Sequence, residues 1–202
     1  MKNRGLHGIT TETHKNLLID AGIVILNYGL GPERGERLLG ATAGGNTFTV
    51  ERDIRDMAEG IDGSKGKTKG FRRVVAENAT MATNLIELTE ENISLAIAGA
   101  LAAEQTPDSG SIDHPDGYIE IISGDIDLDS YHDNIALAGT LSNGSPIIII
   151  LYNVLSDENF ELGQTDKEES VIAVTFSAHW DPADENRPPW AIRYPKIEGG
   201  GE

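Results

Sequence analysis

The sequence predicts a mainly β fold: a β-sandwich or barrel with one flanking α-helix and a long projecting β-hairpin. Many short apolar or alternating segments are separated by turn signals, which is typical of all-β domains. Only one stretch has helical spacing, and strand and helix patterns do not alternate, which disfavours a parallel α/β architecture. At 202 residues and 39% hydrophobic content, the chain is expected to form one globular domain.

The charge is strongly negative and unevenly placed. The 33 Asp and Glu residues outnumber the 16 Lys and Arg residues, giving a net charge of −17. Residues 1–80 carry 12 basic and 10 acidic side chains, a net of +2, whereas residues 81–202 carry 4 and 23, a net of −19. We therefore do not expect the protein to wrap nucleic acid or to bind anionic membranes.

Other composition features exclude further classes. The chain has no cysteine, so disulfides, thiolate metal sites and thiol nucleophiles are excluded. The polar segment Met1–Thr13 lacks the apolar centre of a signal peptide, which predicts a protein made and kept in a cytosol. The longest apolar run, Ile147–Leu151, extends at most to Leu155 and is far shorter than the roughly 20 residues of a membrane span.

The first half of the domain is predicted to contain one buried strand followed by a long β-hairpin. Leu17–Tyr28 is apolar on both sides of its alternation, which predicts a strand buried on both faces. Phe48–Ile54 alternates as a half-exposed strand, and Phe71–Leu88 returns as a long extended segment. Residues 57–70 between them hold four glycines and three lysines, so we expect a flexible tip on a projecting hairpin that spans residues 47–77.

The second half is predicted to begin with the single helix, over residues 89–104. Thr89 is a suitable N-cap, although the third helical position is Asn92 and not the Glu or Gln of a capping box. After a polar loop at 104–117, four strands are expected. They are Tyr118–Ser123, Asn134–Leu141, Pro146–Leu155 and Val171–Trp180. A Ser-Asn-Gly-Ser turn is expected to join the middle two as a hairpin. In the last strand, Ile172, Val174 and Phe176 are predicted to face the same side.

The remaining segments are expected to lack regular structure. Residues 182–195 are rich in proline and read as irregular. The predicted organisation is thus an N-terminal arm (1–16), one domain (17–195) and a flexible C-terminal tail (196–202).

Motifs for catalysis or cofactor binding are not found. Residues 60–68, GIDGSKGKT, lack the first glycine of a phosphate-binding loop, because that position is Ile61. Gly29-x-Gly31 lacks the third glycine of a dinucleotide fingerprint. No GxSxG or HExxH pattern occurs, so we expect neither an enzyme nor a bound cofactor or metal. For His179 we expect a structural hydrogen bond.

Two alternative ligand sites stay open. Asp125, Asp127 and Asp129 resemble the start of a calcium loop, but Ser130 and Ala136 replace its glycine and bidentate glutamate. The alternation of acidic and apolar residues favours a strand with these carboxylates in solvent and with Ile126 and Leu128 facing the core. The alternative is a weak divalent-cation site. Trp180 and Trp190 are residue types that stack on sugars, although tryptophans near prolines more often close the edge of a core.

One basic cluster points to a partner. Lys65, Lys67, Lys69, Arg72 and Arg73 lie on the predicted hairpin, where Phe71 is the only aromatic residue that would stack on a base. A basic arm is complementary to the acidic remainder of another copy of the chain. Such a contact joins two different surfaces, and contacts of this kind generate rings or filaments.

The sequence resembles the major tail, or tail tube, proteins of long-tailed bacteriophages and related prophage particles. The resemblance covers most of residues 17–195 and rests on the order and extent of several strings. They are LIDAGIVILNYG (18–29), RLLGATAGGNTFTVERDIRDM (37–57), GSKGKTKGFRR (63–73), ATMATNLIELTEENISLAIAGA (79–100), NIALAGTL (134–141), PIIIILYNVLSDENFEL (146–162), DKEESVIAVTFSAHWDP (166–182) and PPWAIRYP (188–195).

The resemblance implies a small β-sandwich that forms hexameric rings stacked into a hollow tube, with the hairpin bridging rings. It implies a virion location after assembly in the host cytoplasm. The implied partners are further copies of the chain, a tape measure protein, and tail terminator and distal tail or baseplate proteins. DNA is implied only as cargo passing through the lumen. The alternatives are a soluble carbohydrate- or cation-binding β-sandwich module and another tail ring component, such as a tail terminator or distal tail protein.

Overall fold

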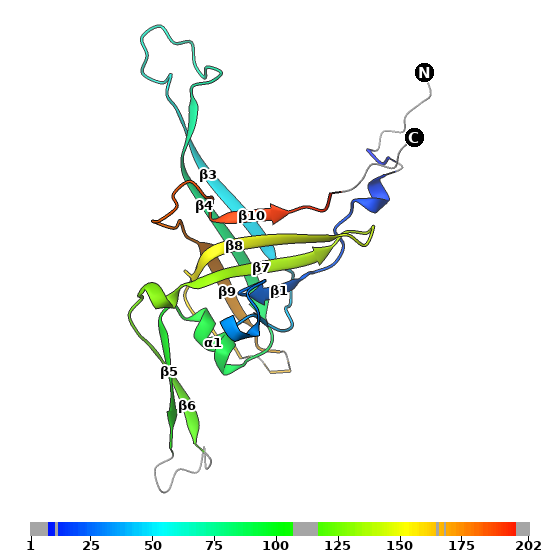
Figure 1. The fold of residues 1–202 in the computed structure, drawn as a ribbon, viewed down its shortest axis with the longest axis vertical. Coiled ribbons are helices and arrows are strands. Elements are labelled where there is room, and N and C mark those ends of the chain that lie inside the picture. The colour runs from blue at the N-terminus through cyan, green and yellow to red at the C-terminus, as the bar shows by residue number, and fades with distance from the viewer. Residues whose placement is uncertain (1–7, 11, 107–116, 165, 168, 197–202) are drawn as a thin grey trace.

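A computed structural model describes residues 8–10, 12–106, 117–164, 166–167 and 169–196. Within these residues the fold is mainly β, with one α-helix and a large antiparallel sheet, as the sequence predicts. Residues 1–7 and 11 of the predicted arm and 197–202 of the predicted tail lie outside the described residues. Figure 1 shows a central body from which two hairpins extend in opposite directions along the longest axis.

The main sheet contains eight strands in the order β2-β1-β7-β8-β9-β4-β3, with β10 paired to β8. All pairings are antiparallel. The strands are β1 (Ile23–Leu26), β2 (Arg37–Leu38), β3 (Thr47–Asp56), β4 (Arg72–Leu85), β7 (His132–Thr140), β8 (Pro146–Ser156), β9 (Ile172–Ala178) and β10 (Trp190–Arg193). A separate two-stranded sheet pairs β5 (Ala100–Gln105) with β6 (Tyr118–Ser123).

Strand β8 joins two halves of the main sheet. It pairs with β7 as far as Val154, and its other partner is β10 up to Leu151 and β9 from Val154 onward. The change of partner occurs at Asn153, which has φ 49°, a left-handed conformation that asparagine tolerates better than most residues. The Asn153 side-chain Nδ2 donates to the backbone carbonyl oxygen of His179, and the backbone carbonyl oxygen of Asn153 lies 3.0 Å from His179 Nδ1. The structural hydrogen bond expected of His179 is thereby confirmed.

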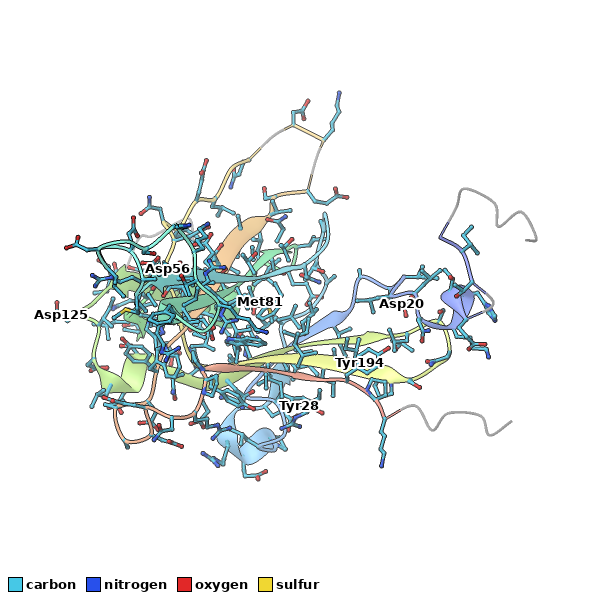
Figure 2. All side chains as sticks on the ribbon, turned by 90° about the horizontal axis from the view of Figure 1, so that it is seen from above. Asp20, Tyr28, Asp56, Met81, Asp125 and Tyr194 are labelled. Atoms are coloured by element: carbon cyan, nitrogen blue, oxygen red, sulfur yellow. The ribbon has the colours of Figure 1, made fainter. Side chains whose placement is uncertain are left out.

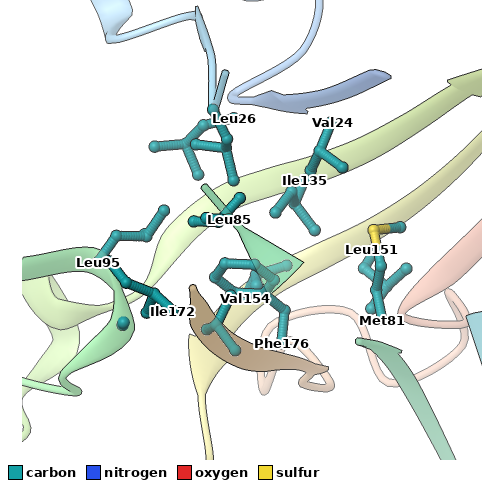
Figure 3. Close-up of a cluster of buried hydrophobic side chains, with 13 residues drawn as sticks. Val24, Leu26, Met81, Leu85, Leu95, Ile135, Leu151, Val154, Ile172 and Phe176 are labelled. Atoms are coloured by element: carbon teal, nitrogen blue, oxygen red, sulfur yellow. The ribbon is translucent and has the colours of Figure 1, made fainter. Parts of the chain in front are cut away.

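The core lies where the two halves pack on each other (Figure 3). Its central residues come from β1, β4, β7, β8, β9 and the helix. Ile172, Val174 and Phe176 are all buried, which confirms the side of the last strand predicted to face inward. The core consists of Val24, Leu26, Leu39, Met81, Leu85, Leu95, Ala96, Ile135, Leu151, Val154, Ile172, Val174 and Phe176.

The helix prediction is wrong in length. The α-helix α1 covers only Glu90–Ala96, capped by Thr89, whose hydroxyl accepts from the backbone N–H of Asn92. The expected helix over 89–104 fails because Gly99, with φ +67°, turns the chain into strand β5. A Cβ at Gly99 would lie 2.7 Å from the Asp125 carbonyl oxygen, so this position requires glycine.

Three other expectations are also corrected. The strand predicted over 17–28 is only β1, and Leu17, Leu18, Ile19 and Ile23 are exposed, so burial on both faces is wrong. The segment predicted irregular at 182–195 contains β10. The strand predicted at 125–129 is absent: Leu128–Ser130 form a 3₁₀ turn, and Ile126 and Leu128 face solvent.

Candidate interaction surface

The basic residues singled out from the sequence lie together at the end of the β3–β4 hairpin. We call this projecting part, residues 51–76, the arm; it points away from the body along the longest axis (Figure 1). Lys65, Lys67 and Lys69 lie in the loop at its tip, and Arg72 and Arg73 open β4. All five side chains are exposed. Within the described residues, none of the three lysines forms an ion pair or a hydrogen bond.

The tip has a defined backbone built on glycine. Gly60, Gly63, Gly66 and Gly70 all have positive φ, between 83° and 120°. The Ser64 and Thr68 hydroxyls donate to the carbonyl oxygen of Gly66, at 3.3 and 3.2 Å. The glycines thus allow the compact turns of the tip, on which the three lysines are exposed to solvent.

The arm is apolar as well as basic. Both faces of its paired strands are exposed beyond Glu51, because no other described element packs on them. A register shift between Asp53 and Ile54 adds a β-bulge to the arm. The exposed large apolar side chains are Ile54, Met57, Ile61, Phe71, Val74 and Val75. Apolar groups arranged in this way around a basic tip indicate a surface for another molecule.

The free edge of the main sheet adds to this surface. Strand β3 is the last strand of the sheet, and among the described residues no strand pairs with its outer side. A ten-residue edge strand presents unpaired N–H and C=O groups that can accept a neighbouring strand.

Arm and body are joined at Glu77. The Glu77 carboxylate accepts from the indole Nε1 of Trp190 at 2.8 Å and lies 2.6 Å from Nε of Arg52. The Trp190 ring packs against Phe48, with ring centroids 5.7 Å apart. Trp190 therefore closes an edge of the core and fixes the base of the arm, which leaves its indole N–H engaged and its ring partly covered.

The sequence reasoning missed a second projecting hairpin, β5–β6. Leu101, Ile119 and Ile122 are each about half exposed, at 57, 51 and 52%. The signals that would have revealed it are Gly99 after the short helix and the matching lengths of Ala100–Gln105 and Tyr118–Ser123, but the apolar spacing of residues 93–101 also fits a helix. The tip at 107–116 lies outside the described residues.

A cleft of about 600 Å³ lies between α1, β2 and the base of this second hairpin. Its lining includes Glu90, Glu91, Asp125, Asp127 and Asp129, together with Arg37 and His132. Burial, and to a lesser degree the positive charge of Arg37, lowers the pKa of His132, whereas Asp133 acts in the opposite direction. Burial lowers the pKa of Arg37, opposed by Glu91 and Glu90.

The acids in this cleft are not arranged as a metal site. Asp127 caps the 3₁₀ turn, its Oδ1 accepting from the backbone N–H groups of Asp129 and Ser130 at 3.0 Å each. In the described part of the chain no group of three or more His, Asp or Glu side chains is placed to hold a metal ion.

Neither a protein-family model nor a curated protein matches the chain. No helix among the described residues is long and apolar enough to cross a membrane.

Proposed function

We propose that this protein is a structural subunit of a bacteriophage tail, which assembles into hexameric rings stacked as the tail tube. The tube encloses the tape measure protein and conducts DNA into the host during infection. The observation that carries the proposal is the arm: a long hairpin with a basic tip and exposed apolar side chains, whose strands beyond Glu51 pair only with each other among the described residues. The resemblance of residues 17–195 to tail tube proteins supports the same function.

An exposed arm of this kind is a liability for a protein that stays monomeric. An isolated two-stranded hairpin is at best marginally stable in water, and exposed apolar faces and strand edges promote association. A subunit with one such arm and one free sheet edge is suited to repeated contacts with identical neighbours. Closing six sheets into a ring removes the free edges, and the arm then reaches the next ring.

The acidic charge fits a conduit for DNA. Of the net −17, residues 81–202 contribute −19 and residues 1–80 contribute +2. A lumen with excess carboxylates repels phosphates, so DNA slides through without binding. DNA is cargo in this proposal, and the lasting partners are other copies of the chain, the tape measure protein, and the tail terminator and distal tail proteins that end the tube.

The experiment is negative-stain electron microscopy and sedimentation velocity of the purified protein over a range of concentration and salt. Six-fold rings or tubes are the expected result. A particle that stays monomeric under all conditions would contradict the proposal, and single rings that never stack would favour a tail terminator or distal tail protein.

Two residues named for the ligand-binding alternatives are already engaged within the chain. Asp127 is engaged in capping its own turn, and the indole N–H of Trp190 is bonded to Glu77. Calorimetric titration with Ca²⁺ checks the cation alternative directly, and we expect neither heat nor a change in melting temperature.

A further inference from the structure

The β5–β6 hairpin has the features of the surface that receives the arm. It is paired only to itself, and both of its long edges lack a strand partner among the described residues. Leu101 and Ile122 are register partners on one face, and Ile119 lies on the other, opposite Glu104. All three apolar side chains are about half exposed. Two strands that show apolar groups on both faces need further packing to be stable.

The charges of the two hairpins are opposite. Residues 61–76, at the end of the arm, carry five basic side chains and one acid, a net of +4. Residues 100–130 carry eight acids and neither Lys nor Arg, a net of −8. Five of these acids lie in the described residues and are exposed: Glu104, Glu120, Asp125, Asp127 and Asp129. Complementary potentials of this kind guide association and fix its register.

The positions of the two hairpins also suit a contact between copies. In Figure 1 the arm leaves one end of the longest axis, and β5 and β6 extend from the opposite end below it. Figure 2 looks along that axis. It shows Asp56, the last residue of β3, on the same side of the molecule as Asp125 and away from Asp20 and Tyr194. A copy displaced along the axis would therefore bring its arm to the β5–β6 hairpin of the next.

We propose that the β5–β6 hairpin, with the acids that follow it, is the docking surface for the arm of a second copy of this chain. The proposal rests on the proposed function and names the two surfaces that meet between stacked rings. The lysines of the tip face the acids of the receiving hairpin, and the apolar faces of the two hairpins cover each other. Because the surfaces differ, each copy gives one arm and receives another, and the contact repeats without closing.

The test is a charge exchange. One variant reverses the charge of the arm with Lys65→Glu, Lys67→Glu and Lys69→Glu; the other removes most of the negative charge of the receiving hairpin with Glu104→Lys, Glu120→Lys and Asp125→Lys. Asp127 is left intact because it caps a turn. The matched control places the same charge change on other exposed acids: Glu158→Lys, Glu161→Lys and Glu169→Lys. Circular dichroism and melting temperature establish that each variant is folded.

The arm variant changes the net charge of residues 61–76 from +4 to −2, and the hairpin variant changes that of residues 100–130 from −8 to −2. Like charges then face each other in the arm variant and the attraction is weakened in the hairpin variant, so we expect the concentration needed for tube formation to rise in both, by at least about tenfold in the arm variant. In a mixture of the two variants, each reversed arm can meet a hairpin of net charge −2 in place of −8, and each unchanged arm can meet an unchanged hairpin, so tubes should form at a lower concentration than with the arm variant alone. The control variant should assemble as the wild type does.

Three results would overturn the proposal. The first is a hairpin variant that forms tubes at the same concentration as the wild type. The second is a mixture that needs as high a concentration as the arm variant alone. The third is a control variant whose tube formation is impaired as much as that of the hairpin variant. Each leaves the tube function standing, because wild-type tubes are still seen. A wild-type protein that never assembles contradicts the tube function itself, and the docking surface with it.

Discussion

At the residue scale, Asn92 connects the helix to the strands around it. It is almost fully buried, its Nδ2 donates to the carbonyl oxygens of Leu39 and Glu87 at 2.9 and 3.0 Å, and its Oδ1 accepts from Arg37 at 2.8 Å. The sequence marked this position only as a departure from a capping box. Its amide has both donors and acceptors where a carboxylate would have acceptors alone.

Replacing Asn92 by alanine should therefore lower the free energy of unfolding by about 2–3 kcal/mol, because the carbonyl groups of Leu39 and Glu87 and the guanidinium of Arg37 lose this partner. Urea denaturation of wild type and variant measures the change. Asn78→Ala, at an exposed position of β4, is the matched control and should change stability by less than about 0.5 kcal/mol. Equal effects at both positions would contradict the role given to Asn92.

His132 makes stability depend on pH. Its pKa is lowered in the folded state, so the unfolded chain binds the proton more readily, and folding is penalised as pH falls from the unfolded value near 6.5. We expect wild type to lose more stability than His132→Gln between pH 7 and 5. The measurement is the difference between their melting temperatures at each pH; a difference that does not vary with pH would refute it.

At the element scale, α1 and β5 show where sequence periodicity was ambiguous. The strands around β7, β8 and β9 followed from apolar alternation and from a strong turn signal, and their observed bounds differ from the expected ones by at most two residues. The apolar spacing of residues 93–101 fits a continuing helix as well as it fits the observed short helix followed by a strand. Residues 100–105 form a strand because they pair with Tyr118–Ser123. A pairing between segments this far apart in the chain cannot be read from local spacing.

Gly99→Ala tests this boundary. An added Cβ meets the Asp125 carbonyl oxygen, and the positive φ strains any other residue, so we expect a loss of about 1–3 kcal/mol and faster hydrogen exchange in β5 and β6. Gly45→Ala, at φ +89° with open space around it, carries the backbone strain without the clash. If both variants were equally destabilised, the contact with Asp125 would have no role.

At the scale of the whole molecule, the proposed docking joins the arm of one copy to the β5–β6 hairpin of the next, and salt tests it because charge contacts between rings and strand pairing within rings respond differently. The Debye length shortens from about 10 Å at 0.1 M to 3 Å at 1 M ionic strength, which weakens attraction between exposed charges but hardly affects strand pairing. Raising NaCl to 1 M should therefore separate stacked rings before rings break into subunits. Sedimentation velocity and electron microscopy distinguish the two; rings that dissociate first would contradict the assignment of charge to stacking.

The sequence by itself determined the β class of this protein, the basic hairpin with Lys65, Lys67 and Lys69, and the inward side of the last core strand. These properties follow from local composition, turn residues and alternation, which act over a few positions. Tertiary structure alone decided the length of the helix, the second hairpin and the alignment of the two hairpins on opposite ends of one axis. Those features depend on which strands pair and which surfaces pack together between segments that are distant in the sequence. Residues adjacent in the chain do not determine either of these.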